Sequence, residues 1–262
     1  MKVALIQTTV GSNFNENFEK SKKFLDASLA SNPDFILLPE CFLFLSNESK
    51  ILIDMNHYCI KYFKDFSKIN KVYLLLGSLP ITEDTKLFNR SILINPDGEI
   101  ISIYDKIHMF DITLKNGESY KESEFYSSGT ELKMAKVLGQ LIGHSICYDL
   151  RYPKLYRALA KKGSKVIVIP SAFTYTTGKA HWHSLIKARA IENSVFILAP
   201  NQWGVNNEKR STYGHSLIVD PWGEILAEAD NSEMIITSEL DLDRVQECQS
   251  AIPVLIHDRN FD

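Results

Sequence analysis

The chain has 262 residues, of which 45% are hydrophobic, so it can build a sizeable core and is not expected to be disordered. Its 29 basic and 32 acidic residues give a net charge of −3, which offers no basis for binding nucleic acid or a membrane surface. No apolar run reaches the roughly 18 residues of a membrane span, and the first run is too short for a signal peptide.

The cysteines give an expectation about the redox compartment. Cys41, Cys59, Cys147 and Cys248 are widely spaced and form no CxxC pair. This spacing favours reduced thiols over a disulfide framework. We therefore expect a cytoplasmic protein.

Short apolar runs recur along the whole chain, from "KVALIQ" near the N-terminus to "MIITSELDLD" near the C-terminus. Several lack strict polar alternation, which is typical of strands covered on both faces. Apolar periodicity predicts helices at 15–30, 153–162 and 181–193. The turns "NPDGE" at 95–99 and "DPWGE" at 220–224 predict two hairpins.

This mixture of helices, strands and hairpins predicts a single α/β domain over 1–262, because no linker or charge block divides the chain. Several buried-type runs end on polar or reactive residues: Glu40, Lys106, Cys147, Ser171, Asn201 and Gln202. Ligands bind in the crevice at the carboxyl ends of strands in open α/β sheets. A strand also ends wherever a polar loop begins, so any single residue of this kind is weak evidence.

Cys147 has two interpretations. It precedes a predicted helix with Pro153 in its first turn, and a helix N-terminus would favour the thiolate. The backbone N–H of Tyr148 could then face a developing oxyanion. The alternative is a buried structural thiol, which is a common fate of cysteine.

A nucleophilic cysteine needs a base and an electrophilic stabiliser. The seven histidines form no recognisable cysteine-protease signature, so Glu40 is the other candidate base. Lys106 could pair with Glu40 or stabilise an oxyanion. A structural Glu–Lys ion pair is the alternative, and the spacing excludes neither.

Three blocks in order, "LLPE" with Glu40, "YDKIHMFD" with Lys106 and "ICYDLRYP" with Cys147, resemble the nitrilase (carbon–nitrogen hydrolase) superfamily. The resemblance continues through "ESEFYSSGTEL" and "YGHSLIVDPWGEILAE". It implies an αββα four-layer sandwich, a homodimer or larger assembly, and no metal or organic cofactor. It also implies hydrolysis of a small amide through a Cys147 thioester.

The resemblance implies a role for each matching residue. Glu40 would be general base and then acid, and Lys106 with the Tyr148 N–H would stabilise the oxyanion. Glu122 would hold Lys106 or orient substrate. We expect Lys106 to lower the pKa of Cys147, and the two carboxylates to raise each other's pKa.

"EKRSTYGHS" at 208–216 is most similar to the branch that includes deaminated glutathione amidase, with ω-amidase as the sister branch. The substrates of both branches are anionic, so we expect positively charged side chains that bind a carboxylate. The candidates are Arg151, Lys209 and Arg210, with solvated surface charge as the alternative for the last two. A third hypothesis is a catalytically silent binding protein on the same fold.

The remaining pocket candidates lie in loops or are departures from the family pattern. Tyr175, Thr176 and Thr177 are expected in a loop that lines the pocket or is only a polar turn. His181, at the start of a predicted helix, and the bulky Trp203 are further pocket candidates. "HWH" at 181–183 looks like a metal-ligand pair, and His183 stands where the pattern has a glutamate. Helix positions i and i+2 do not share a face, so we expect no metal site.

Overall fold

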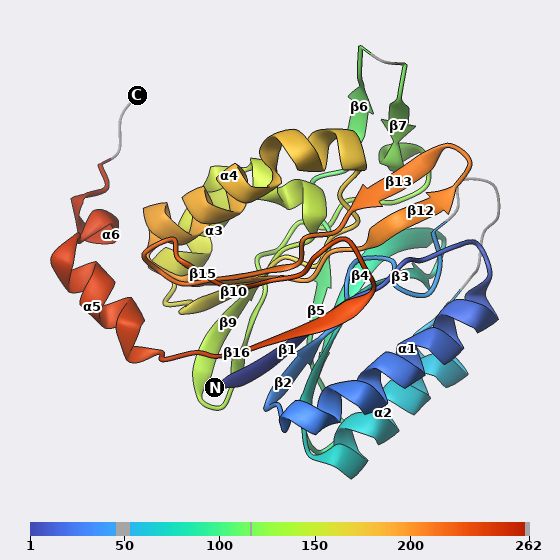
Figure 1. Ribbon diagram of the computed structural model, residues 1–262, viewed down its shortest axis with the longest axis horizontal. Helices are drawn as coiled ribbons and strands as arrows, with labels where there is room; N and C mark the ends of the chain where they lie inside the picture. The colour runs from blue at the N-terminus through green and yellow to red at the C-terminus, as the bar shows by residue number, and fades with distance from the viewer. Residues whose placement is uncertain (46–52, 116, 260–262) are drawn as a thin grey trace.

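The computed structural model describes residues 1–45, 53–115 and 117–259 (Figure 1). The strands of its first sheet are β1 (Lys2–Gln7), β2 (Phe35–Leu37), β3 (Tyr73–Glu83), β4 (Lys86–Ile94), β5 (Ile100–Asp105) and β16 (Met234–Glu239). Their order across the sheet is β16-β1-β2-β3-β4-β5. The central pairs β1–β2 and β2–β3 are parallel, whereas the other pairs are antiparallel.

A second sheet of the same size packs against the first. Its strands are β8 (Met134–Val137), β9 (Gln140–His144), β10 (Val166–Val168), β11 (Phe196–Ala199), β14 (Leu217–Val219) and β15 (Ile225–Glu228). Their order is β15-β14-β11-β10-β9-β8. Two small hairpins pair β6 (Asp111–Thr113) with β7 (Ser119–Lys121) and β12 (Trp203–Asn207) with β13 (Arg210–Tyr213).

Helices cover the outer face of each sheet. The helices are α1 (Phe14–Ser28), α2 (Tyr58–Asn70), α3 (Pro153–Lys161), α4 (Tyr175–Asn193), α5 (Asp243–Ala251) and α6 (Val254–His257), with 3₁₀ turns η1 (Leu29–Ser31), η2 (Glu122–Glu124) and η3 (Cys147–Arg151). Helices α1 and α2 lie on the first sheet, and α3 and α4 lie on the second (Figure 1). The layers are therefore αββα, as the resemblance implies.

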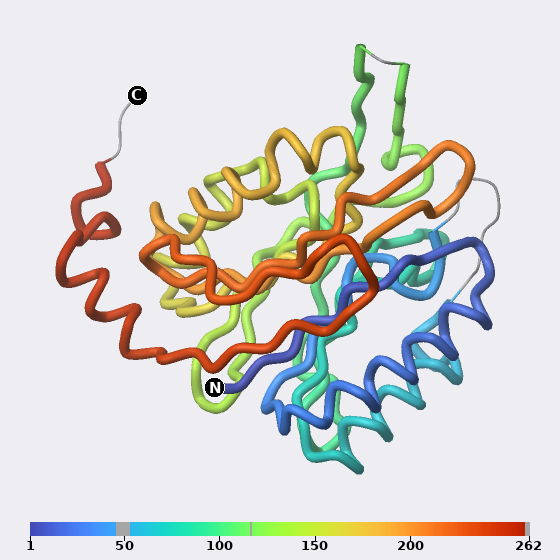
Figure 2. Tube along the Cα trace, in the orientation of Figure 1, coloured from blue at the N-terminus to red at the C-terminus, as the bar shows by residue number. Residues whose placement is uncertain are grey.

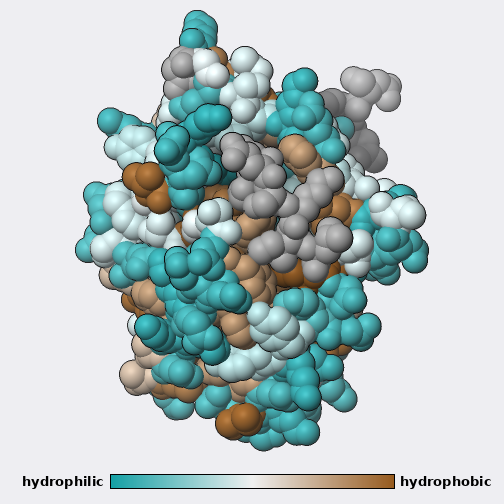
Figure 3. All heavy atoms as spheres, turned by 90° about the vertical axis from the view of Figure 1, so that its right-hand side faces the viewer, coloured by the Kyte–Doolittle hydropathy of each residue, from teal (hydrophilic) through white to brown (hydrophobic). Residues whose placement is uncertain are grey.

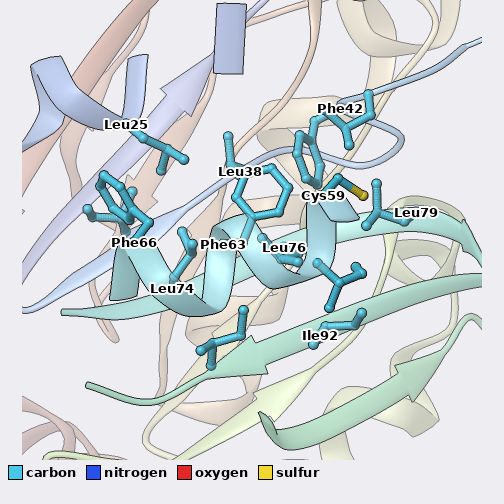
Figure 4. Close-up of a cluster of buried hydrophobic side chains, with 14 of the residues drawn as sticks. Leu25, Leu38, Phe42, Cys59, Phe63, Phe66, Leu74, Leu76, Leu79 and Ile92 are labelled. Carbon is cyan, nitrogen blue, oxygen red and sulfur yellow. The ribbon is translucent and has the colours of Figure 1, made fainter. Parts of the chain in front are cut away.

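The two-residue period of a strand explains these layers. In β1, Val3 and Leu5 pack in the core between the sheets, whereas Ala4 and Ile6 pack in the core beneath the helices. Figure 4 shows this second core, where Leu25 of α1 and Phe63 of α2 lie over strand side chains of the first sheet. Both faces of the central strands are buried, so their sequences show no polar alternation.

Segments from both ends of the described chain meet in the first sheet. Strand β16 pairs antiparallel with β1, with Lys2 opposite Glu239, and the two lie side by side in Figure 2. Further on, Leu255 packs on the core beneath α3 and α4, and Asp258 forms a 2.7 Å ion pair with Lys161 of α3. The C-terminal segment therefore covers part of its own core, although 260–262 lie outside the described residues.

The predicted hairpin turns are confirmed, since β4 pairs with β5 and β14 with β15. The helix predicted at 181–193 instead begins at Tyr175, so the expected loop there is wrong. Helix α2 was not predicted, although buried Cys59, Ile60 and Phe63 in it follow a helical period. The helical spacing of apolar residues in α2 could therefore have been recognised in the sequence.

The surface is more polar than the buried layers. Figure 3 shows the face to the right in Figure 1, which is largely hydrophilic with scattered hydrophobic patches. Among the residues that the structure describes, no helix combines the length and apolar character needed to span a membrane.

Candidate active site

Residues that follow three strands meet at one cavity. Glu40 follows β2 by three residues, Lys106 directly follows β5, and Cys147 follows β9 by three residues. The first two come from one sheet and the third from the other. All three line a cavity of about 400 Å³, which is within the usual range for small-molecule sites.

Gly77 of β3 allows the two sheets to approach closely behind this cavity. A Cβ atom there would lie 2.0 Å from the Leu38 carbonyl oxygen and 2.6 Å from Cβ of Pro170. The Pro170 carbonyl accepts a 3.0 Å hydrogen bond from the Cys147 N–H. The missing side chain therefore lets the segment before Glu40 pack against the segment that holds Cys147.

Lys106 lies between two carboxylates. Its Nζ donates to Oε1 of Glu40 at 2.8 Å and to Oε2 of Glu122 at 2.8 Å. The Lys106 and Glu40 side chains are only 2% and 5% exposed, and that of Glu122 is 13% exposed. The pairing compensates for the loss of hydration that burial imposes on these charges.

Three further donors hold the carboxylates in place, and sequence reasoning missed all of them. Asn89 Nδ2 donates to Oε1 of Glu40 and to Oε1 of Glu122, both at 2.9 Å. The backbone N–H of Ala172 donates to Oε2 of Glu40 at 2.8 Å, and that of Phe110 donates to Oε2 of Glu122 at 2.7 Å. A buried asparagine inside an apolar strand was the one available signal.

The charge balance reverses one expectation. Burial raises the pKa of Glu40, but the charge and hydrogen bond of Lys106 outweigh it and hold the pKa below its ordinary value. Burial likewise opposes the Lys106 charge, yet Glu122 and Glu40 raise its pKa well above the usual range. The expected raised pKa of Glu40 is therefore wrong for the free enzyme, where the ammonium separates the two carboxylates.

Cys147 begins η3 with φ of 44°, a left-handed conformation that costs a non-glycine residue about 1–3 kcal/mol. Its side chain lines the same cavity as Glu40. Burial raises the pKa of the thiol well above its ordinary value, and the Glu40 charge raises it further against the pull of Lys106. The expected lowering of the Cys147 pKa is therefore wrong, and the resting thiol is protonated beside a carboxylate.

The turn that carries Cys147 is separate from the helix predicted to activate it. Helix α3 begins only at Pro153, after η3 has ended. Buried Asp149 holds η3, because its Oδ2 accepts from the Ile146 N–H at 2.9 Å and from the Tyr104 hydroxyl at 2.7 Å. Tyr148, in the first turn of η3, lines the cavity.

Polar residues after β11 support Glu40 from behind. Gln202 Nε2 donates to the Glu40 carbonyl oxygen at 2.6 Å. Asn201 Oδ1 accepts from the Phe173 N–H at 3.0 Å, next to the Ala172 amide that binds Glu40. The polar ends of several strands thus meet around one site.

Of the three candidate cations, Arg210 lines the cavity. Its guanidinium lies 5.4 Å from the Tyr120 ring, and one nitrogen donates to the Ala172 carbonyl at 2.8 Å. Its buried Nε has no hydrogen-bond partner in the described ranges. Lys209 is exposed, and Arg151 lies outside the cavity lining, over the rings of Tyr148 and Phe173.

Of the other predicted pocket residues, only Thr177 lines the cavity. Tyr175 and Thr176 start α4 with exposed side chains, and Thr176 donates to Glu118 at 2.6 Å. His181 is exposed beside Arg151, at 3.4 Å. Trp203 packs near Gly214. Thr177, one helical position further, does line the cavity, because successive helix residues point in different directions.

The fold and this Glu–Lys–Cys cluster define a class of hydrolase. The sequence model of the carbon-nitrogen hydrolase family matches residues 2–250, and the chain belongs to that family. It is an enzyme of the kind that hydrolyses amides.

Relatives at full length narrow the comparison. The chain is 35% identical to "Deaminated glutathione amidase" of Dictyostelium discoideum over 98% of this chain and 93% of that protein. It is 33% identical to "Omega-amidase NIT3" of Saccharomyces cerevisiae over 100% of this chain and 94% of that one. The crystal structure of Saccharomyces cerevisiae Nit3, a nitrilase-superfamily member, matches with a TM-score of 0.87 at 30% identity, covering 97% of this chain and 94% of that one.

Proposed function

We propose that the protein is a thiol amidase in which Cys147, Glu40 and Lys106 carry the reaction. The observation that supports this most is the buried cluster itself. A buried, protonated thiol and an ionised carboxylate line the wall of one cavity, with an ammonium 2.8 Å from that carboxylate. A purely structural ion pair would not need a thiol at the same point.

In the first half-reaction, Cys147 Sγ attacks the amide carbon as Glu40 takes the thiol proton. Lys106 and the Tyr148 N–H stabilise the oxyanion. Glu40 then gives its proton to the leaving nitrogen, the C–N bond breaks, and the amine leaves from a Cys147 thioester. Glu122 keeps Lys106 charged and in position throughout.

In the second half-reaction, water enters where the amine left. Glu40 takes a proton from that water, and the resulting hydroxide attacks the thioester. The oxyanion meets the same donors, the C–S bond breaks, and Glu40 returns the proton to sulfur. One carboxylate serves both steps because each step needs one proton taken and one returned.

The cavity supports an anionic substrate. Besides Lys106, two cationic residues line it: Lys121, which is exposed and pairs with Glu124 at 3.4 Å, and Arg210, which is held by the Ala172 carbonyl. Arg210 is therefore the better-ordered candidate for binding a carboxylate.

Arginine recognises carboxylates in a planar geometry. The Arg210 guanidinium lies over the Tyr120 ring. The N–H at Nε of Arg210 has no hydrogen-bond partner in the described residues and is available to donate to a substrate carboxylate.

We infer that the substrate is deaminated glutathione, hydrolysed to 2-oxoglutarate and cysteinylglycine. The relatives named above support this substrate, and Arg210 in the cavity fits its carboxylates. The second candidate is α-ketoglutaramate or another small aliphatic amide, and the named ω-amidase favours it.

A product assay separates the two candidates. Both substrates release 2-oxoglutarate, but ammonia comes only from α-ketoglutaramate. We expect kcat/KM to be higher for deaminated glutathione than for α-ketoglutaramate, glutamine, simple amides or nitriles. A preference for α-ketoglutaramate would select the second candidate, and no turnover of any amide would contradict the amidase itself.

The Arg210→Gln variant tests substrate charge. We expect the KM for the anionic substrate to rise by about tenfold or more, because a charge-assisted pair is lost, while a neutral aliphatic amide is unaffected. The matched control is Lys209→Gln, which removes the exposed neighbouring charge. Equal losses on charged and neutral amides would contradict a role for Arg210 in binding the carboxylate.

We further propose that the chain works as one catalytic domain in a homodimer or larger assembly in the cytoplasm. The four free, buried cysteines are compatible with a reducing compartment. Light scattering of the purified protein measures the assembly. A monomer at micromolar concentration would contradict it.

A further inference from the structure

Outside the active-site cavity, three metal-binding side chains converge where β14 begins and β15 ends, at the β15 edge of the second sheet. His183 comes from α4, His215 from the segment before β14, and Glu228 from the end of β15. Their ligand atoms all lie within 4.8 Å of one another, and no other such group of histidine, cysteine, aspartate or glutamate occurs in the described part of the chain. Three ligands from three elements cannot be read from sequence spacing.

The geometry is close to that of a metal site. His183 Nε2 and His215 Nδ1 lie 2.9 and 2.8 Å from the same oxygen, Glu228 Oε1. Ligand atoms around a tetrahedral Zn²⁺ lie about 3.3 Å apart, given metal–ligand distances of about 2.0–2.2 Å. A shift of the carboxylate by about half an ångström would therefore admit the ion.

The surrounding structure holds the ligands in place. The carbonyl of His215 accepts a 2.7 Å hydrogen bond from the Trp182 indole, and the residue has a left-handed φ of 54°. The Tyr213 ring stacks on the His215 ring at 4.5 Å and meets the His183 ring edge-on at 6.0 Å. Locked ligand orientations of this kind favour metal binding.

Exposure and charge at this site also suit a metal. The His183, His215 and Glu228 side chains are 33%, 20% and 35% exposed, so an ion could enter and keep water in its remaining positions. The Glu228 carboxylate supplies an anionic oxygen ligand beside the two imidazoles.

We propose that His183, His215 and Glu228 form a structural site for a divalent transition metal of the zinc type. Two imidazoles and one carboxylate are ligands that Zn²⁺ prefers, and calcium or magnesium would need more oxygen ligands. The ion would tie α4 to the β14–β15 hairpin. This site is independent of the proposed amidase activity.

This site revises the interpretation of the "HWH" sequence. His181 and His183 do not share a face of α4, and His181 lies beside Arg151 instead. Only His183 contributes, with partners that are 32 and 45 residues further along the chain. The expectation that there is no metal site rested on the pair alone.

The test is calorimetric titration of Zn²⁺ into the Cys147→Ala protein. The substitution removes the active-site thiol, which would otherwise compete for the metal. We expect one equivalent to bind, and we expect His183→Gln and Glu228→Gln each to weaken binding by about tenfold or more. His181→Gln is the matched control, with an unchanged affinity. The Co²⁺ complex should show the visible absorption of a four-coordinate ion and lose it in the same two variants.

Two results would overturn the proposal. One is the absence of stoichiometric binding in the Cys147→Ala protein. The other is equal affinity in the His183→Gln and His181→Gln proteins, which would place the metal elsewhere and leave a hydrogen-bonded His–Glu–His cluster. Circular dichroism of each metal-free variant checks that it is folded, and Glu228→Asp provides a second variant that keeps the carboxylate.

Discussion

Two cysteines line the same cavity, and they share more than they differ in. Cys147 and Cys41 are both 7% exposed, and both have a left-handed backbone, with φ of 44° and 51°. Burial raises the pKa of both thiols, to about 12 for Cys41. Burial, backbone strain and access to the cavity therefore do not distinguish a nucleophile from a structural thiol here.

The difference lies in the partners. The Glu40 carboxylate acts on the Cys147 thiol and raises its pKa, whereas the Cys41 sulfur lies 3.9 Å from the hydroxyl of Ser78. Ser78 cannot act as a base at neutral pH, and Glu40 can. A high thiol pKa is then compatible with catalysis, because the proton leaves during attack rather than before it.

The first test of this comparison has the largest expected effect. Cys147→Ala should reduce kcat/KM for the best amide by roughly 10⁴-fold or more, because the bond-forming atom is removed. Cys41→Ala should stay within about tenfold of the parent. A similar loss in both variants would mean that the cavity needs both thiols structurally.

The second test removes the proposed base. Glu40→Gln keeps the side-chain shape and should lower kcat by about 10²–10⁴-fold. Asn89→Asp or Asn89→Leu should cost less, because the Ala172 N–H and Lys106 still hold Glu40. A loss below about tenfold in Glu40→Gln would argue against its role as base.

The third test uses the pH dependence of alkylation by iodoacetamide. Glu40 raises the pKa of Cys147 and Lys106 lowers it, so Glu40→Gln should shift the pKa of Cys147 downward. Its alkylation should then begin at lower pH than in the parent, even though turnover falls. Peptide mapping by mass spectrometry separates Cys147 from the other three cysteines, and an upward shift would contradict the assigned charges.

The smallest expected effect concerns stability behind the site. His144 ends β9, is fully buried, and neither ring nitrogen has a hydrogen-bond partner within the described residues. Burial lowers its pKa from 6.5 to about 4, so its stabilising contribution is complete above pH 6.5 and is lost as the pH falls toward 4. That loss amounts to about 3 kcal/mol.

Denaturant unfolding at several pH values measures this contribution. In His144→Phe, the free energy of unfolding should fall less between pH 6.5 and 4 than in the parent. His181→Gln, an exposed histidine, serves as the control and should leave the slope unchanged. An equal pH dependence in parent and His144→Phe would mean that other groups dominate acid unfolding.

Local patterns in the sequence predict the buried strands and the residues that follow them. Runs of apolar residues predict buried strands because burial on both faces requires them, and Glu40, Lys106 and Cys147 each follow such a run. That places three reactive residues at the edges of sheets. Glu122 became a candidate only through the resemblance, because the exposed strand β7 before it carries no such signal.

Contacts between distant segments lie beyond those patterns. The Ala172 N–H reaches a carboxylate 132 residues away, and Asn89 joins two glutamates from separate segments. The predicted pocket residues Tyr175 and Thr176 lie on a helix that points them to solvent, while Thr177 and Arg210 line the cavity. Side-chain direction depends on where a helix begins, and the sequence predicted the start of α4 six residues too late.

The sequence by itself predicted an α/β domain with reactive residues at strand ends, because burial and periodicity are local properties of the chain. The four layers and the reaction class were implied by the resemblance of three sequence blocks to the carbon–nitrogen hydrolases. Only the tertiary structure decided the protonation state of Cys147 and Glu40, since a pKa depends on burial and on charges brought near by folding. It also brought His183, His215 and Glu228 together from three separate elements. Charge interactions and metal coordination depend on distances in space, and the spacing of residues along the sequence does not give those distances.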